Sequence, residues 1–226
     1  MSKLNTNSNT YIIIYSSILV IIVAFLLAFV FKALKPMQDA NVALDVKKQI
    51  LYSLNIRDLD GAEAEAKYAE VVKEEKEEDG QKVYICDVDG QEVCVFSMKG
   101  MGLWGGISGY VAIHDADGPT VYGAYFNHEG ETAGLGAEIK DSQAWQEQFI
   151  GKKVFKNGDY GRIALSVVKK VDDPATQVDC VTGATLTSNG VNDMIHDGLK
   201  PLMQEIQSAI TEQVPPCTVD STAIAE

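Results

Sequence analysis

Apolar residues form one long stretch near the start of the chain. Residues 11–31 carry no charged side chain, and a helix of that length, at about 1.5 Å per residue, spans the roughly 30 Å hydrocarbon core of a membrane. A secretory signal peptide has a shorter apolar region and a small-x-small cleavage site. Residues 28–31 (Ala-Phe-Val-Phe) do not offer such a site. The pattern predicts an N-terminal tail over 1–10 and a transmembrane helix over 11–31.

After this span the apolar residues recur at helical spacing. Pro36 is expected to break the first helix. One face of a second helix, from about 37 to 55, is then marked by Val42, Val46, Ile50 and Leu54. We interpret residues 32–60 as a stalk that packs on the following domain. Residues 61–82 are rich in Ala, Glu and Lys, and their charge run over 74–79 predicts a solvated helix or loop.

Alternating patterns in the following domain, residues 61–212, predict strands. Residues 83–85 and 93–96 flank Asp89-Gly90, a strong hairpin signal. Further strands are predicted over 110–114 and 121–126, and more within 154–168, interrupted at Asn157-Gly158.

Helical patterns complete the domain. A short helix is predicted over 145–150 and a longer one from Thr187 or Ser188 to Lys200, where Pro201 kinks or restarts it. Residues 213–226 are interpreted as a C-terminal tail. The predicted fold class is α+β, with a twisted antiparallel sheet, packed helices and one N-terminal transmembrane helix.

Composition narrows the functional classes. The net charge of −13 argues against nucleic acid as a partner, because such binding needs a basic surface. The four cysteines, Cys86, Cys94, Cys180 and Cys217, follow no zinc or redox spacing. A three-residue loop at the predicted hairpin would place Cys86 opposite Cys94. A disulfide and buried free thiols both remain open for this pair.

The candidate chemistry centres on residues 179–188, which are small or hydroxylated. Gly183 and Ala184 allow another molecule to approach the backbone closely. Hydroxyl groups surround this gap on Thr182, Thr185, Thr187 and Ser188. A helical pattern follows, so these groups lie at a helix N-terminus, which favours a phosphate. The alternative is that Thr187 or Ser188 is only the N-cap of that helix.

Two other segments invite interpretation. The glycine-rich residues 99–106 are not followed by Lys-Ser or Lys-Thr, and the alternation after them predicts a strand, so neither a P-loop nor a Rossmann turn is indicated. A tight bend with Trp104 in the core is the structural alternative. In the loop 128–136, His128 is interpreted as structural or exposed. No nucleophile, base and orienting carboxylate form a readable set, so no catalytic residue and no metal site is predicted.

The order Asp-x-x-Thr-Gly-Ala-Thr-x-Thr over residues 179–187 resembles the flavinylation motif of the FMN-binding domain family. This resemblance implies that a flavin transferase joins FMN through a phosphoester to Thr187. It assigns recognition by the transferase to Asp179. Cofactor contacts are implied for Thr182, Gly183, Ala184, Thr185 and Ser188.

Within that family the chain resembles the C subunits of sodium-translocating NADH:quinone oxidoreductases. The resemblance lies in Leu-Lys-Pro-x-Gln-x-x-Asn over 34–41 and Gly-x-Gly-Leu-Trp over 100–104. It implies that Leu103 and Trp104 stack on the flavin or shield it from water. Residues 128–136 resemble His-x-x-Glu-Thr-Pro-Gly-Leu-Gly, with Ala133 in place of proline, which loosens the turn. Flavin contacts are implied for Glu131, Thr132 and Leu135, and a nearby positive charge for Lys169.

The resemblance implies an oxidoreductase component that carries electrons on covalent FMN, from an iron–sulfur centre towards the next flavin and quinone. Its implied partners are the other subunits, the flavin transferase and membrane lipid around 11–31. Its implied location is the bacterial inner membrane, single-pass, with the domain on the periplasmic side. The lysine count disagrees, because Lys32 and Lys35 follow the span and only Lys3 precedes it.

Two other functions remain open. One is the flavin subunit of an Rnf-type electron-transport complex, which the Gly-x-Gly-Leu-Trp segment and the stalk disfavour. The other is a membrane-anchored, non-redox binding module in which residues 182–187 only cap a helix. Sodium transport by this chain alone is not expected, because the span offers only Ser16, Ser17 and tyrosines as polar groups.

Overall fold

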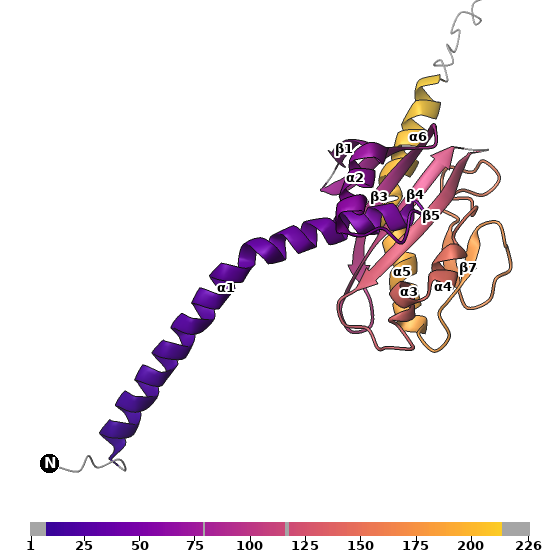
Figure 1. The fold of residues 1–226 in the computed structure, drawn as a ribbon. Helices are drawn as coiled ribbons and strands as arrows, with labels where there is room; N and C mark the ends of the chain where they lie inside the picture. Colours follow the sequence, from indigo (N-terminus) through magenta and orange to yellow (C-terminus); the bar gives the residue numbers. More distant parts are fainter. Residues whose placement is uncertain (1–7, 79, 116–117, 214–226) are drawn as a thin grey trace, which may run out of the picture. The chain divides into compact units, whose positions relative to one another are not determined.

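The computed structural model describes residues 8–78, 80–115 and 118–213 (Figure 1). The chain divides into two compact units, residues 1–46 and 47–226. Most of the predicted C-terminal tail, with Cys217, lies outside the described residues.

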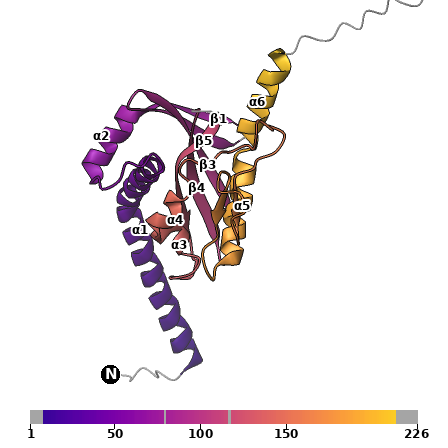
Figure 2. The same cartoon turned by 90° about the vertical axis from the view of Figure 1, so that its right-hand side faces the viewer.

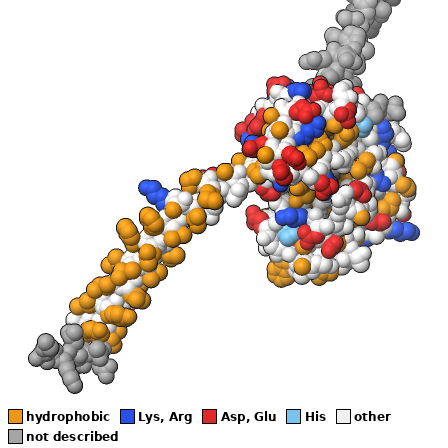
Figure 3. All heavy atoms as spheres, viewed as in Figure 1, with side chains coloured by type: hydrophobic (Ala, Val, Ile, Leu, Met, Phe, Trp, Pro, Cys, Tyr) orange, Lys and Arg blue, Asp and Glu red, His pale blue; other side chains and the backbone are white. Residues whose placement is uncertain are grey.

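Helix α1 (Asn9–Ser53) begins the described chain and contains an apolar window of 18 residues with mean hydropathy 3.0, none of it buried. Its N-terminal part is covered with hydrophobic side chains (Figure 3). By length and composition this is the one helix in the described residues able to cross a membrane. The predicted break at Pro36 is wrong, because α1 continues through it. Proline removes one backbone donor, and the neighbouring hydrogen bonds keep the helix continuous.

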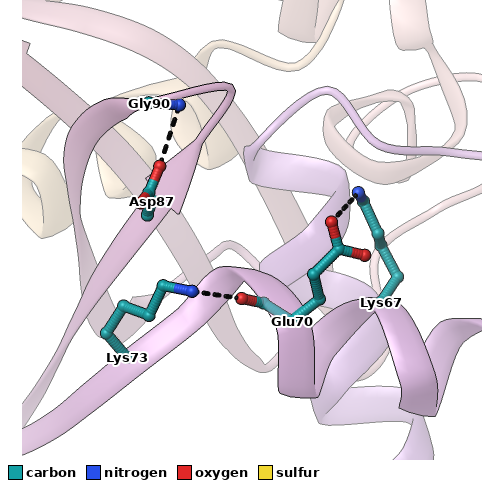
Figure 4. Close-up of polar contacts among 5 residues, drawn as sticks. All are labelled: Lys67, Glu70, Lys73, Asp87 and Gly90. Carbon is teal, nitrogen blue, oxygen red and sulfur yellow. Dashed lines mark hydrogen bonds and ion pairs between the residues drawn. The ribbon is translucent and has the colours of Figure 1, made fainter.

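The second unit is built on a five-stranded antiparallel sheet in which strands adjacent in sequence pair in the order β1-β2-β3-β4-β5. The strands are β1 (Val72–Glu78), β2 (Gln81–Val88), β3 (Gln91–Met101), β4 (Gly106–Asp115) and β5 (Pro119–His128). The predicted hairpin at Asp89-Gly90 is confirmed as a two-residue turn with φ of 54° and 81°, as a type I′ turn requires. Asp87 Oδ1 accepts a hydrogen bond of 2.9 Å from Gly90 N (Figure 4).

This turn corrects the interpretation of the cysteines. With Val88 opposite Gln91, the loop has two residues rather than three, so Cys86 pairs with Val93 and Cys94 with Ile85. A shift of one residue places Cys86 and Cys94 on opposite faces of the sheet. Both are free thiols, as is Cys180. Burial and the neighbouring Cys94 raise the pKa of Cys86 to about 12, so it stays protonated at neutral pH.

The acidic segment also needs a correction. Residues 61–71 form helix α2 (Gly61–Val71), but the charge run that follows forms most of edge strand β1, not a helix or loop. Charged side chains suit an exposed edge, because they oppose pairing with another chain. Glu70 joins the helix to the strand: it accepts hydrogen bonds from Lys67 Nζ at its carboxylate (2.9 Å) and from Lys73 Nζ at its backbone carbonyl (2.7 Å) (Figure 4).

Helices cover both faces of the sheet (Figure 2). Helix α5 (Thr185–Gly198) packs along β3 on one face, over a core that includes Phe96, Val111, Phe126, Val191 and Met194. The last turns of α1 and helix α2 bury the other face with Ile50, Leu51, Leu54 and Ala64. Of the predicted apolar face, Ile50 and Leu54 are buried, whereas Val42 is 63% exposed.

The end of α1 is fixed on β5 at Gly123. A Cβ at this position would collide with the carbonyl oxygen of Ser53. The Asn55 side chain next to it donates a 2.8 Å hydrogen bond to the carbonyl of Tyr122. The close approach of backbone to backbone therefore depends on glycine.

We expect Gly123→Ala to destabilise the domain by about 1–3 kcal/mol, because the helix end must move away from the strand. In a domain of this size that lowers the thermal unfolding midpoint of the detergent-solubilised chain by several degrees. Gly130→Ala is the matched control, because a Cβ there meets nothing within 4 Å. Equal midpoints for the two variants would contradict the prediction.

The remaining elements lie beyond β5. Helices α3 (Glu138–Asp141) and α4 (Gln143–Glu147) contact β5, and β6 (Ser166–Val168) pairs in parallel with β7 (Gln177–Asp179). The strands predicted over 154–168 are largely wrong: only β6 is regular, with isolated bridges at Lys153 and Lys156. Helix α6 (Lys200–Gln213) restarts next to Pro201 as predicted. The α+β class is confirmed.

Candidate functional site

Three segments that are distant in the sequence meet at the carboxylate of Glu131, which is 8% exposed. One oxygen, Oε1, accepts a 2.9 Å hydrogen bond from Trp104 N in the turn between β3 and β4. The other, Oε2, accepts a 2.6 Å hydrogen bond from Thr187 Oγ1 in the first turn of α5. Glu131 itself lies in the loop after β5. The site predicted from separate motifs is therefore brought together around one side chain.

Glu131 is held in its ionised form. Burial raises the pKa of its carboxyl group, but hydrogen bonds from Thr187 and from the backbone amides of Trp104 and Leu103 outweigh burial. Together with the nearby His128, they hold the pKa of Glu131 below its ordinary value. At neutral pH a buried negative charge therefore lies between the turn and the helix.

This shift has a consequence for stability. A carboxyl group whose folded-state pKa is lowered stabilises the fold above its unfolded pKa of about 4.3 and loses that contribution as pH falls through the folded value. We expect the thermal midpoint of the native chain to exceed that of Glu131→Gln at pH 7, and the difference to shrink as pH falls towards 3. A difference that is independent of pH would contradict an ionised Glu131.

The turn between β3 and β4 displays its large side chains to solvent. Gly102 N donates to Gly105 O at 2.9 Å, which confirms the predicted tight bend. Trp104 is 69% exposed and Leu103 is 47% exposed, so the alternative that Trp104 is a core residue is wrong. The segments that meet at Glu131 carry further exposed apolar residues, Met101, Leu135 and Leu186. We call these five residues the apolar rim, a candidate binding surface.

Met101 and Leu186 were not predicted as site residues. The sequence did hold an indication for Leu186, because it lies off the helical face marked by Val191, Met194 and Ile195. Met101 carries no such indication, since its exposure follows from the end of β3.

The motif hydroxyls occupy different environments. Helix α5 begins at Thr185, its N-cap is Ala184, and no side chain caps it. The alternative in which Thr187 or Ser188 is the N-cap is therefore wrong. Thr187 is 1% exposed, and Ser188 is buried and accepts a 3.0 Å hydrogen bond from Val181 N. Thr185 is half-buried and Thr182 is exposed.

The loop between β5 and α3 forms without the family proline. The carbonyl of Thr132 accepts 3.1 Å hydrogen bonds from Leu135 N and Ala137 N, which close the turn that contains Ala133. Gly134 takes a φ of 72°, and Leu135 packs beside Gly183 of the motif. His128 Nδ1 accepts a 3.2 Å hydrogen bond from Glu131 N, which gives this histidine a structural contact.

Asp179 and Lys169 lie at a neighbouring edge. Asp179 ends β7 opposite Val168, the residue before Lys169, and both charged side chains are exposed. The carbonyl of Asp179 accepts a 2.8 Å hydrogen bond from Trp145 Nε1. Among the described residues, the hydrogen bonds around Glu131 include neither side chain.

These features suit a planar ring that bears a phosphate. An exposed indole and an aliphatic neighbour offer a stacking surface. The first turn of α5 offers backbone N–H groups that have no intrahelical acceptor.

Comparison with known proteins agrees with this geometry. Residues 102–200 match the FMN-binding domain family. The fold and the site thus define an FMN-binding domain.

The similar proteins narrow the family. The C subunit of the Na(+)-translocating NADH-quinone reductase from Neisseria meningitidis is 38% identical over 158 residues, 67% of this chain and 56% of that protein. The crystal structure of the same reductase component from Parabacteroides distasonis is 34% identical with a TM-score of 0.66, covering 74% of this chain and 93% of that one. The chain belongs to the family of Na(+)-translocating NADH-quinone reductase C subunits. NqrC from Shewanella oneidensis, 20% identical with a TM-score of 0.58 over 73% of this chain and 97% of that one, shares the fold.

The chain spans about half the length of the curated relatives it matches. It covers 56% of the Neisseria protein and 49% of the corresponding protein from Yersinia pestis, which is 37% identical over 56% of this chain.

Proposed function

We propose that this chain is the FMN-bearing electron carrier of a membrane Na⁺-translocating NADH:quinone oxidoreductase. The observation that carries the proposal is the apolar rim beside the first turn of α5, inside the segment that matches the FMN-binding domain. FMN supplies the electron chemistry when it is bound, and the protein orients it and controls its surroundings. The names of the relatives supply the class of complex.

The flavin ring is assigned to the apolar rim. We assign to it Trp104 and Leu103 from the β3–β4 turn, and Thr132 and Leu135 from the loop after β5, all of which are exposed. Thr182, Gly183 and Ala184 lie beside the phosphate end, where the small side chains leave the backbone accessible. Lys169, at the end of β6, offers a positive charge at the neighbouring edge.

The residue to which we propose that FMN is attached differs from the one predicted from the sequence. The sequence predicts Thr187, but its hydroxyl is buried and donates to Glu131. A phosphoester on that oxygen would place a second negative group against a buried carboxylate, which is unfavourable. Thr185 belongs to the same motif, is half-buried and is the first residue of α5. We therefore propose that a flavin transferase joins FMN to Thr185, and that Asp179 and Ser188 serve recognition and local structure.

The apolar part of α1 supports a membrane anchor. We propose that residues 11–31 span the bacterial inner membrane once, that 32–60 form the stalk and that the FMN-binding domain over 61–212 lies on the periplasmic side. The proposed partners are the other subunits of the complex, with an iron–sulfur centre as donor and the next flavin, on the way to quinone, as acceptor. No side chain in the span offers a path for Na⁺, so transport belongs to those partners.

The intact mass of the full chain, coexpressed with a flavin transferase, tests the proposal. A mass raised by one FMN less water, with a fluorescent denatured band on a gel, is expected. The same chain expressed without the transferase is the control and should have its unmodified mass. An unmodified mass in both samples would leave a membrane-anchored binding module. Purification with the subunits of an Rnf-type complex would assign the flavoprotein to that complex instead.

A further inference from the structure

Both oxygens of the Glu131 carboxylate accept hydrogen bonds from within the protein. Its Oε1 accepts from Trp104 N and its Oε2 from Thr187 Oγ1, so each oxygen serves a different element. Because both oxygens already bind the protein, we consider a role for Glu131 within the fold beside the flavin contact that the family resemblance implies.

Glycines close the space around the carboxylate. A Cβ on Gly136 would lie 2.7 Å from Thr187 Oγ1 and would collide with Glu131 Oε2. A Cβ on Gly102 would collide with Glu131 Oε1 and lie 3.0 Å from Ile107 Cγ2. The carboxylate is thus enclosed by backbone on both sides, which fixes its two oxygens towards the turn and the helix.

The Trp104 ring is held by little side-chain packing. It is 69% exposed, so the position of the indole depends on its backbone rather than on side-chain packing. That backbone is joined to the loop after β5 through Glu131. At the far end of the turn, Gly106 is joined to Glu129 by two further hydrogen bonds: Gly106 N donates to Glu129 Oε2 at 3.3 Å, and Gly106 O accepts from Glu129 N at 3.0 Å.

We propose that Glu131 is a positioning residue: its carboxylate ties the Leu103–Trp104 turn to the first turn of α5 and so sets the distance between the aromatic wall and the attachment threonine. The inference rests on the proposed function only in taking the flavin ring as the group that Leu103 and Trp104 face. The tie itself is a property of the protein without flavin.

Amide hydrogen exchange of the full chain, expressed without the transferase, tests this tie. In Glu131→Leu the amides of Leu103 and Trp104 lose their acceptor, and we expect their exchange to accelerate about tenfold, as the loss of a charge-assisted hydrogen bond implies. Glu131→Gln should rescue most of the protection, because its amide oxygen still accepts and its NH₂ can donate to the Thr187 hydroxyl. Glu129→Leu is the matched control and should leave both amides unchanged.

One further variant keeps the test decisive. If Glu131→Leu does not fold, Glu131→Asp retains the charge on a shorter side chain that cannot reach both partners, and it should also expose the two amides. Unchanged exchange in the folded variant would overturn the proposal, as would a Glu131→Gln variant that is as exposed as Glu131→Leu. Failure of the proposed function is separate, because it is read from the FMN mass of the native chain expressed with the transferase.

Discussion

The Thr185→Val variant, coexpressed with a flavin transferase, is expected to keep its fold and to lose the entire mass of FMN. Valine is similar in shape to threonine but has no hydroxyl, so no phosphoester can form at that position. Thr185 is half-buried at the start of α5, where a small change in polarity costs little stability. Intact mass spectrometry and the thermal unfolding midpoint together measure both parts of the expectation.

Thr187→Val is the matched variant, two residues further along the same motif. We expect the reverse result: Thr187→Val should retain the mass of FMN and should be less stable than the native chain. The lost hydroxyl leaves Glu131 Oε2 buried without its donor, a change that costs about 1–3 kcal/mol. Flavin retained in Thr185→Val and lost in Thr187→Val would restore the sequence-based assignment, and would require the bond between Thr187 and Glu131 to open during flavinylation.

Trp104→Ala is expected to change the flavin environment strongly and the stability little. In the proposed flavin site the indole stacks on the ring, where it would quench flavin fluorescence and shield one face from water. Its removal should increase the flavin fluorescence of the native protein several fold and admit a water-soluble quencher. Because Trp104 is 69% exposed, the unfolding free energy should change by no more than about 0.5 kcal/mol.

The second tryptophan gives a control in which stability should change strongly and flavin fluorescence little. Trp145 is 6% exposed and packs against Phe126 and Phe149, so Trp145→Ala should cost about 3–5 kcal/mol. If that variant folds, its flavin fluorescence should stay close to that of the native protein. Flavin fluorescence unchanged in Trp104→Ala would refute the assignment of the apolar rim as the flavin site.

Features that depend on neighbouring residues could be predicted from the sequence. The uncharged stretch over 11–31 is long enough to span a membrane, and the structure places it in a single apolar helix. The Asp89-Gly90 dipeptide predicted the hairpin, because positive φ at both positions selects the turn type. The ordered motif over 179–187 located the candidate site, and the resemblance of that motif supplied the cofactor.

Features that depend on counting residues across a turn were less predictable. One residue fewer in the β2–β3 loop moved Cys86 and Cys94 to opposite faces, because side chains alternate along a strand. Two other differences have another cause. Helix α1 continues through Pro36, and a charged run forms β1, because hydrogen bonds to neighbouring residues outweigh the local propensities.

The roles of the site residues followed from tertiary packing alone. Glu131 and Thr187 are separated by 56 residues, and Glu131 and Trp104 by 27, yet hydrogen bonds join all three. No periodicity or motif contains such contacts, because they form only when the sheet and α5 pack together. The burial of Thr187 and the exposure of Trp104 arise from that packing. The sequence named the residues of the candidate site, whereas the fold decided which of them are exposed at its surface and which are buried and joined to one another.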